Sequence, residues 1–276
     1  MKLVAFSKLF KDMSVDELVQ WALENRLDGY DLCLREGYPV NPANVADELP
    51  AAAEKMRAAG LSIPMLTGEG NLLEASDPTA EPILAAMAEA GVPMIKLGYY
   101  RFNPLEMDYW ERVDECRRAL EGWQELAGKH GVKVLYHTHS NRCMGLNCSC
   151  LMHLLRGLDP RHVGAYIDTG HMVIEGEEFP VGVAMVRDYL SAVAFKDAIN
   201  WRKGENGHGI PERYWGPAGS GLVNWTAVLA ELVRVGFDGP ITVHCEFQVP
   251  EAKFAETARQ EFAFFRERLD AAMSSA

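Results

Sequence analysis

The chain has 276 residues, of which 48% are hydrophobic and 24% charged, and its 39 acidic and 27 basic side chains give a net charge of −12. This composition is typical of a soluble globular protein and excludes a disordered chain. The acidic balance argues against binding to nucleic acid or to an anionic membrane surface, because both depend on a basic surface. No run reaches the roughly 18 apolar residues of a membrane span. We therefore expect a cytoplasmic protein, and the charge says little about a small ligand.

Short apolar runs alternate with longer stretches of helical period along the whole chain. In the first of these stretches, "SVDELVQWALENRL", Ser14 and Glu17 have the spacing of a capping box. Several later stretches end in Gly directly before an apolar run, as in "AAGLSIPML" and "KHGVKVLY", which is the pattern of a helix-to-strand turn. The predicted strands are 3–6, 29–34, 61–66, 94–97, 132–137, 163–168, 192–195 and 241–245.

Eight strand-and-helix units predict a single domain, residues 1–276, folded as an α/β (β/α)8 TIM barrel. The alternative is an open, doubly wound sheet. No G-x-G-x-x-G follows the first strand to mark the dinucleotide site of such a sheet. The Gly-rich segment 200–221 is expected to be a long loop between the seventh strand and the last helices.

Polar side chains stand at the carboxyl ends of four consecutive predicted strands, where the active site of a TIM barrel lies. Successive residues of a strand point to opposite faces, so residues two apart share a face. This period groups His137 with His139, and His244 with Glu246. It also places Asp168 and Lys196 at the same open end of the barrel, and the turn "DTGH" brings His171 over that end.

The segments "YHTH", "DTGH", "FKD", "GPAGSGLVNW" and "GPITVHCEF" together resemble the xylose-isomerase-like TIM barrels, a superfamily of sugar and sugar-phosphate isomerases and epimerases that also includes inosose dehydratases and the endonuclease IV group. The resemblance covers nearly the whole chain. It implies a small carbohydrate or polyol substrate. The endonuclease branch is disfavoured by the net charge of −12.

Members of that superfamily usually hold a divalent cation with a Glu, an Asp, a His and a Glu on the last four strands. Asp168 and Glu246 match this pattern, whereas His137 stands at the first Glu position and Ala194 at the His position. The resemblance thus implies Mn, Zn, Co or Fe bound by His137, Asp168 and Glu246. The alternative is a metal-free mouth in which these groups bind a polyol directly.

The same mouth supplies candidates for catalysis and for substrate binding. Lys196 can stabilise an enolate, and His139, His171, His244 and Glu246 are candidates for moving the proton. The candidates for substrate binding are Arg35, Glu69, Trp201 and Trp215. Each has a structural alternative, since a strand-end Lys or Arg also forms ion pairs and a loop Trp also packs its own loop.

We therefore expect a sugar isomerase or epimerase that moves a proton beside a carbonyl, with metal assistance. Two alternatives stay open: a lyase that dehydrates an inosose or a keto-sugar on the same site, and a barrel that binds sugar without catalysis. A single sequence does not choose the substrate or the stereochemistry, because this fold hosts many chemistries. Homodimer formation is also left open.

Overall fold

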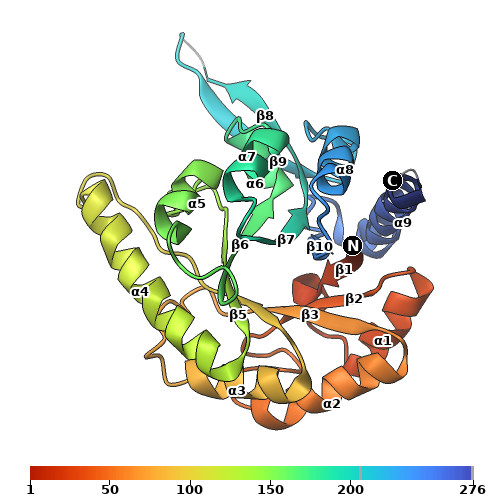
Figure 1. The fold of residues 1–276 in the computed structure, drawn as a ribbon. Helices are drawn as coiled ribbons and strands as arrows, with labels where there is room; N and C mark the ends of the chain where they lie inside the picture. Colours follow the sequence, from red (N-terminus) through yellow and green to blue (C-terminus); the bar gives the residue numbers. More distant parts are fainter. Residues whose placement is uncertain (205–206, 275–276) are drawn as a thin grey trace.

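A closed barrel of eight parallel strands forms the centre of the molecule (Figure 1). The computed structural model describes residues 1–204 and 207–274. Around the barrel the strand order is β1-β10-β7-β6-β5-β4-β3-β2, and every neighbouring pair is parallel. The predicted TIM barrel is confirmed. Its strands are β1 (Lys2–Phe6), β2 (Gly29–Cys33), β3 (Ser62–Thr67), β4 (Met94–Lys96), β5 (Lys133–His137), β6 (Val163–Asp168), β7 (Leu190–Phe195) and β10 (Pro240–Val243).

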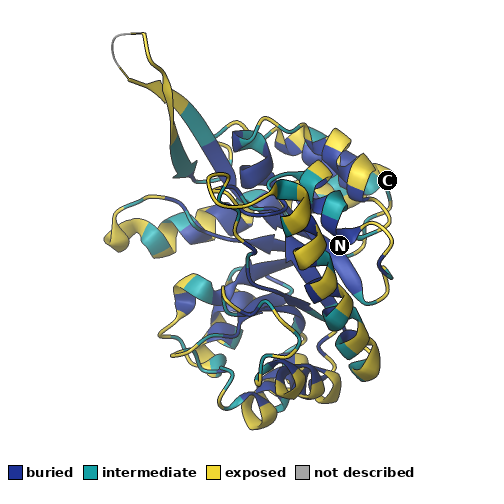
Figure 2. Ribbon diagram, turned by 90° about the vertical axis from the view of Figure 1, so that its left-hand side faces the viewer, coloured by how far each residue is buried: buried dark blue, intermediate teal, exposed yellow. Residues whose placement is uncertain are grey.

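Helices cover the outside of the barrel and turn their buried faces toward it (Figure 2). Ser14 and Glu17 form the predicted capping box, and Gly91 and Gly131 end their helices in the left-handed conformation. A short additional helix, α6, follows β6 directly. The helices are α1 (Val15–Glu24), α2 (Val45–Ala58), α3 (Ala80–Ala90), α4 (Tyr109–His130), α5 (Cys148–Leu155), α6 (Thr169–Ile174), α7 (Phe179–Val186), α8 (Trp225–Arg234) and α9 (Phe254–Ser274), with 3-10 turns at Ser7–Phe10 and Glu251–Lys253.

The segment expected to be a loop is instead an antiparallel hairpin, made of β8 (Asp197–Lys203) and β9 (Ile210–Gly216). It projects away from the barrel (Figures 1 and 2), and much of its surface is exposed. Because its outer part buries neither face, it carries no continuous apolar run, and the sequence pattern used for the barrel strands does not find it. The expectation of a loop was therefore wrong for residues 200–203 and 210–216.

Asp197 ties the base of this hairpin to the chain that follows it. Its carboxylate accepts hydrogen bonds from backbone N–H groups of Gly219, Gly221 and Val223 at 2.8–3.1 Å, and from the Trp225 indole N–H at 3.2 Å. The donors alternate along the chain, which explains the G-x-G-x-V-x-W pattern of the sequence. A Cβ on Gly221 would lie 2.1 Å from the Asp197 carboxylate. The G-x-G-x-V-x-W segment therefore has a structural role. By binding Asp197 it fixes the position of the neighbouring residue, Lys196, at the end of β7.

Glu261 of α9 is buried beneath the same region and makes stability depend on pH. One oxygen accepts a hydrogen bond from the Ala218 N–H at 2.9 Å, and the other has no hydrogen-bond partner among the described residues. Burial raises the pKa of Glu261 to about 7. The folded pKa exceeds the unfolded one, so the stabilising contribution is present below about pH 4.5 and is lost as the pH rises through 7.

We therefore expect Glu261→Gln to raise the free energy of unfolding by about 2 kcal/mol at pH 8 and to change it little at pH 4.5. The amide keeps an acceptor for Ala218 without carrying a buried charge. Denaturant unfolding of both proteins at the two pH values measures the difference. An equal gain at both pH values would contradict this account, because it would point to packing rather than to ionisation.

No helix in the described ranges is both long and apolar enough to cross a membrane.

Candidate active site

The carboxyl ends of the barrel strands enclose a cavity of about 240 Å³, which we call the mouth. His137 lies at the end of β5, Asp168 at the end of β6, and Lys196 directly after β7. His244 and Glu246 follow β10. The chain between them turns at Cys245, whose φ of +51° lies in the left-handed region. The mouth therefore gathers the predicted polar strand ends from β5, β6, β7 and β10.

Lys196 lies at the centre of these charges and is almost fully buried. Its Nζ is 2.9 Å from a Glu246 oxygen and 3.5 Å from an Asp168 oxygen. Burial alone would lower the pKa of Lys196, but the charges of Asp168 and Glu246 outweigh burial and raise it. The same attraction holds the pKa of both carboxyl groups well below the usual range, although burial opposes it. At neutral pH the site therefore holds one ammonium between two carboxylates.

Two histidines lie beside Lys196 in the uncharged form. The Nε2 atom of His171 is 3.1 Å from the Lys196 Nζ, and the Ser140 hydroxyl lies 2.9 Å from its other nitrogen. Burial lowers the pKa of His171, and it lowers the pKa of His139 to about 4. His139 donates its Nδ1–H to the Ser140 carbonyl at 2.7 Å, which leaves its Nε2 lone pair free. A neutral imidazole with a free Nε2 is a base that can accept a proton.

His137, at the end of β5, and His244, after β10, both bring a ring nitrogen close to Asp168. The His137 Nε2 lies 3.6 Å and the His244 Nδ1 lies 3.9 Å from the same Asp168 oxygen. None of these three buried atoms has a hydrogen-bond partner in the described part of the chain. Burial lowers the pKa of His137 to about 3, so its imidazole is neutral. Unpartnered buried nitrogens around a carboxylate are the kind of donors that a metal ion uses.

The arrangement nevertheless does not fit a divalent cation. Lys196 already places a positive charge between Asp168 and Glu246, where the predicted ion would lie. Within residues 1–204 and 207–274, no three His, Cys, Asp or Glu side chains converge on a common metal position. A cation would therefore require Lys196 to move. As the residues stand, Lys196 supplies the charge that the family resemblance assigns to a metal.

Trp215, predicted to bind substrate, lies behind the lining of the mouth and contacts two of its residues from the base of β9. Its ring lies 4.1 Å from the Lys196 Nζ and 5.0 Å from the His171 ring. Gly170 permits this approach, because a Cβ there would meet the Trp215 ring at 2.9 Å and the Lys196 carbonyl at 3.0 Å. The glycine of "DTGH" is thus explained by close packing. The cation–π contact adds to the forces that orient the ammonium group.

Of the other three predicted substrate-binding residues, one lies in the mouth and two lie outside it. Arg35 lines the mouth and donates its Nε–H to the Gly68 carbonyl at 3.3 Å. Glu69 lies outside the lining and accepts a hydrogen bond from the Glu36 N–H at 2.9 Å. Trp201 is half exposed on the hairpin, where it packs against Tyr214. The structure therefore brings Arg35 and Trp215 to the site, and it gives Glu69 and Trp201 structural contacts.

Sequence reasoning missed two buried charged residues on the opposite side of the barrel. Lys96 ends β4 and lines the mouth, with its Nζ 3.6 Å from the centre of the Tyr99 ring. Asp31 of β2 accepts a hydrogen bond from Thr67 at 2.8 Å, and burial raises its pKa to about 6. Both stand in apolar strand runs, so the argument that found Lys196 and Asp168 would also have found them.

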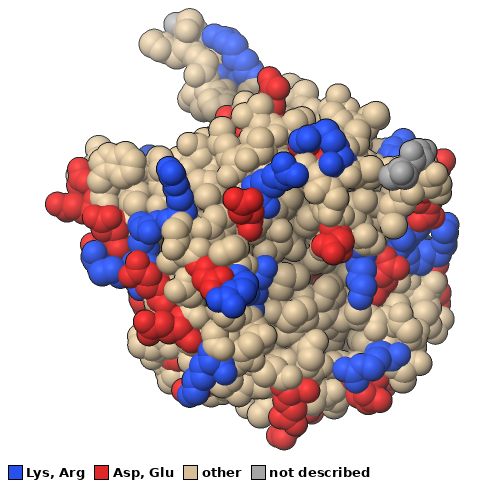
Figure 3. Space-filling model, in the orientation of Figure 1, with Lys and Arg blue, Asp and Glu red and all other residues tan. Residues whose placement is uncertain are grey.

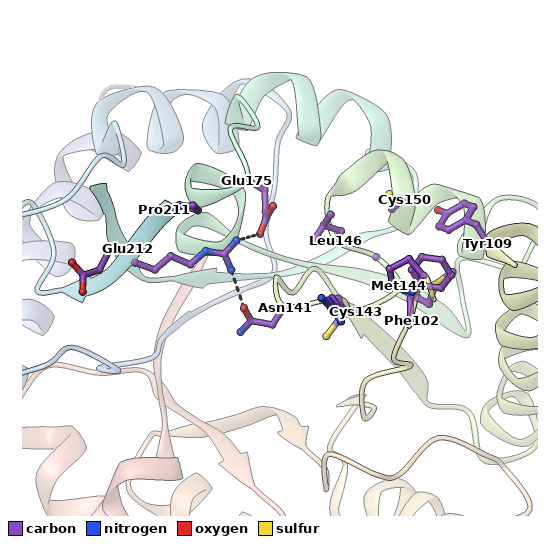
Figure 4. Close-up of a pocket in the computed structure, with 14 residues that line it drawn as sticks. Phe102, Tyr109, Asn141, Cys143, Met144, Leu146, Cys150, Glu175, Pro211 and Glu212 are labelled. Carbon is purple, nitrogen blue, oxygen red and sulfur yellow. Dashed lines mark hydrogen bonds and ion pairs between the residues drawn. The ribbon is translucent and has the colours of Figure 1, made fainter. Parts of the chain in front are cut away.

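A second, larger pocket of about 840 Å³ lies beside the mouth (Figure 4). Phe102, Met144 and Leu146 give it an apolar side (Figure 4). Arg213, which also lines it, donates hydrogen bonds to Glu175 at 2.8 Å and to Asn141 at 2.9 Å. It borders the mouth through the chain around residue 143.

Comparison with known proteins identifies the relatives of this chain. The family described as "Xylose isomerase-like TIM barrel" matches residues 19–268. Among curated proteins, an inosose dehydratase of Lacticaseibacillus casei is 25% identical over 175 residues, which are 60% of this chain and 56% of that protein. The chain therefore aligns with little more than half the length of this relative.

Solved structures share the fold at lower identity. A 3-keto-D-glucoside 4-epimerase from E. coli superposes with a TM-score of 0.74 at 17% identity, covering 97% of this chain and 99% of that one. A probable 3-DHS dehydratase from Bacillus anthracis superposes with a TM-score of 0.72, also at 17% identity, covering 96% and 99% of the two chains. At such identities the similarity establishes a common fold and leaves the reaction to the site itself.

Proposed function

The chain belongs to the xylose isomerase-like TIM barrel family, and from this premise we propose that it catalyses proton transfer beside the carbonyl of a keto-sugar or related polyol, as an epimerase or isomerase. The observation that carries the proposal is the buried Lys196 ammonium, held between Asp168 and Glu246 inside the mouth. Proton removal beside a carbonyl places negative charge on the carbonyl oxygen. A fixed, buried cation stabilises that charge more than the neutral substrate.

In the proposed mechanism, the substrate carbonyl oxygen binds to the Lys196 ammonium and a neutral base removes the adjacent proton. His139 fits the base, because its free Nε2 lies in the mouth and its other nitrogen is fixed by the Ser140 carbonyl. His139 then carries the proton and returns it at the neighbouring carbon, which completes an isomerisation. For an epimerisation, the Glu246 carboxylate would first take up a proton from solvent and then deliver it to the other face, while Lys196 keeps its contact with the enolate oxygen. His171 and His244 act as positioning residues, since they contact Lys196 and Glu246.

A dehydratase is the second candidate, and the similarity to inosose dehydratases favours it. The first step would be the same proton removal. The enolate would then expel a hydroxyl group from the next carbon, and a protonated histidine would donate the proton that makes this group leave as water. The two reactions share the residues around Lys196 and differ in which bond breaks second.

Solvent isotope exchange tests the shared step. We expect the protein, incubated in D₂O with D-tagatose, D-fructose or an inosose, to place deuterium on the carbon beside the carbonyl of at least one of them. Proton NMR measures the exchange and separates an epimer, an isomer and a dehydrated product. Binding without exchange would instead identify a sugar-binding barrel, and turnover without deuterium would exclude the proposed chemistry.

The divalent cation, whether Mn, Zn, Co or Fe, stays a prediction to be tested by the same exchange assay. Elemental analysis of the purified protein, and exchange before and after chelation, decide between Lys196 and an ion as the source of positive charge. Exchange that resists chelation supports the arrangement described here. A cytoplasmic location and a homodimer also stay predictions, open to cell fractionation and to sedimentation analysis.

A further inference from the structure

We propose that the side of the mouth formed after β2 and β4 binds a carboxylate or phosphate group of the substrate, held by Arg35, Lys96 and Arg101. This inference deepens the proposed function, because it assigns the substrate to the anionic sugar derivatives. The three residues are called the anion subsite below. They line the same cavity as Lys196.

Within the described ranges, no carboxylate lies at ion-pair distance from the three cations of the anion subsite, and the charge of the buried Asp31 acts on Lys96 only from farther away. Lys8 and Lys196, the other cations of the mouth, are both paired with Glu246. No Asp or Glu in the described ranges forms an ion pair with a member of the anion subsite. Figure 3 shows how Lys and Arg lie among Asp and Glu on the surface of this acidic protein. The anion subsite thus gathers three cations inside a cleft, and a cleft concentrates its field on a ligand.

Lys96 gives the strongest evidence among the three. It is 1% exposed, and its Nζ has no hydrogen-bond partner among the described residues. Burying a cation without a partner is costly, so an anionic ligand beside Lys96 would offset a cost that the protein alone leaves in place. The nearest compensation is the face of the Tyr99 ring at 3.6 Å. Burial lowers the pKa of Lys96 to about 7, which an arriving anion would reverse.

Each of the two arginines lies near an aromatic ring that also lines the mouth. The Arg101 guanidinium lies 5.8 Å from the Tyr99 ring, and its NH1 donates to the Asn141 carbonyl at 3.1 Å. The Arg35 guanidinium lies 5.9 Å from the Phe6 ring and is fixed through its Nε. Both therefore keep N–H groups free for a ligand. Two planar guanidinium groups and one ammonium are the donors that carboxylate and phosphate oxygens prefer.

The anion subsite lies across the barrel from the proposed reaction centre. In the circular strand order, β2 is opposite β6 and β4 is opposite β10. A substrate that spans the mouth would thus place its anionic group near Lys96 and its carbonyl near Lys196. Binding at the far end fixes the carbonyl against the ammonium, and such positioning contributes to catalysis. The cavity of about 240 Å³ has room for a single sugar unit.

Equilibrium binding tests the inference without relying on turnover. The probes are D-gluconate for a carboxylate, D-glucose 6-phosphate for a phosphate, and neutral D-glucitol, each titrated by calorimetry in 0.1 M salt. We expect at least one anionic probe to bind about 30-fold more tightly than D-glucitol, and we expect Lys96→Met and Arg35→Gln each to remove about 10-fold of that preference. The probe that binds more tightly tells whether the group is a carboxylate or a phosphate.

A matched control is Lys11→Met, which removes a cation lying over Tyr38 outside the mouth. It should leave the preference for an anion intact. Equal binding of charged and neutral probes, or an equal loss in Lys11→Met, would overturn the anion subsite. Isotope exchange on a neutral keto-sugar is unaffected by that outcome, so failure of the subsite and failure of the proposed reaction are distinguishable.

Discussion

Replacing Lys196 with Met is expected to lower kcat by about 10³-fold on any substrate that shows isotope exchange. The ammonium group is the only cation of the described residues that contacts both Asp168 and Glu246, and the proposed mechanism places the enolate oxygen on it. Losing one preorganised donor to a developing oxyanion costs roughly 10²- to 10³-fold, and loss of a full charge lies at the upper end. Steady-state kinetics, together with isotope exchange, measure the effect.

The same substitution should also change how the stability of the protein depends on pH. Without the ammonium group, the buried Asp168 and the partly buried Glu246 lose the positive charge between them, and one of the two carboxylates should bind a proton near neutral pH. We therefore expect the stability of Lys196→Met to fall as the pH rises from 5 to 8. The folded pKa of that carboxyl group would lie above its unfolded value, so the loss follows its ionisation.

A matched control for Lys196→Met is Lys203→Met, which removes an exposed lysine paired with Glu212 on the hairpin. It should retain the kcat of the unmodified protein. A loss of less than 10-fold in Lys196→Met would contradict the assigned role. If addition of a divalent cation restored activity to Lys196→Met, the ammonium group would be shown to stand in for a metal.

The barrel was predictable because its strands are buried on both faces. Runs such as Leu3–Phe6 and Val163–Ile167 are continuous and apolar, and Gly91 and Gly131 mark the helix ends before β4 and β5. The hairpin of β8 and β9 was not predictable by this pattern, since the outer part of both strands is exposed and buries neither face. Its position depends on contacts made by Asp197 with residues more than twenty positions away.

The site was predictable only in part, because a strand end tells which residue faces the mouth and not what that residue contacts. The period-2 argument placed His137, Asp168 and Lys196 together. It did not show that Lys196 would fill the expected metal position, since that depends on the relative heights of three strands. Glu69 illustrates the same limit, because its carboxylate turns to the Glu36 N–H instead of the mouth.

Asp197→Ala is expected to lower the free energy of unfolding by about 3–5 kcal/mol, the second large effect. The carboxylate is fully buried and joins the base of β8 to Gly219, Gly221, Val223 and Trp225. Its removal leaves several buried N–H groups without an acceptor, each of which costs roughly 1–3 kcal/mol before the structure relaxes. Denaturant unfolding, with circular dichroism to follow it, measures the loss.

Asp197→Asn distinguishes this hydrogen-bond network from simple loss of volume. One carboxylate oxygen accepts from Gly219, Gly221 and Trp225, and the other accepts from Ala198 and Val223. An amide must therefore direct its NH₂ at N–H donors in either orientation, and we expect Asn to destabilise the protein nearly as much as Ala. Asp238→Asn, at an exposed aspartate, should change stability by less than about 0.5 kcal/mol. If Asn at 197 were tolerated as well, the alternating G-x-G-x-V-x-W donors would not require a carboxylate, and the position of Lys196 would depend on packing alone.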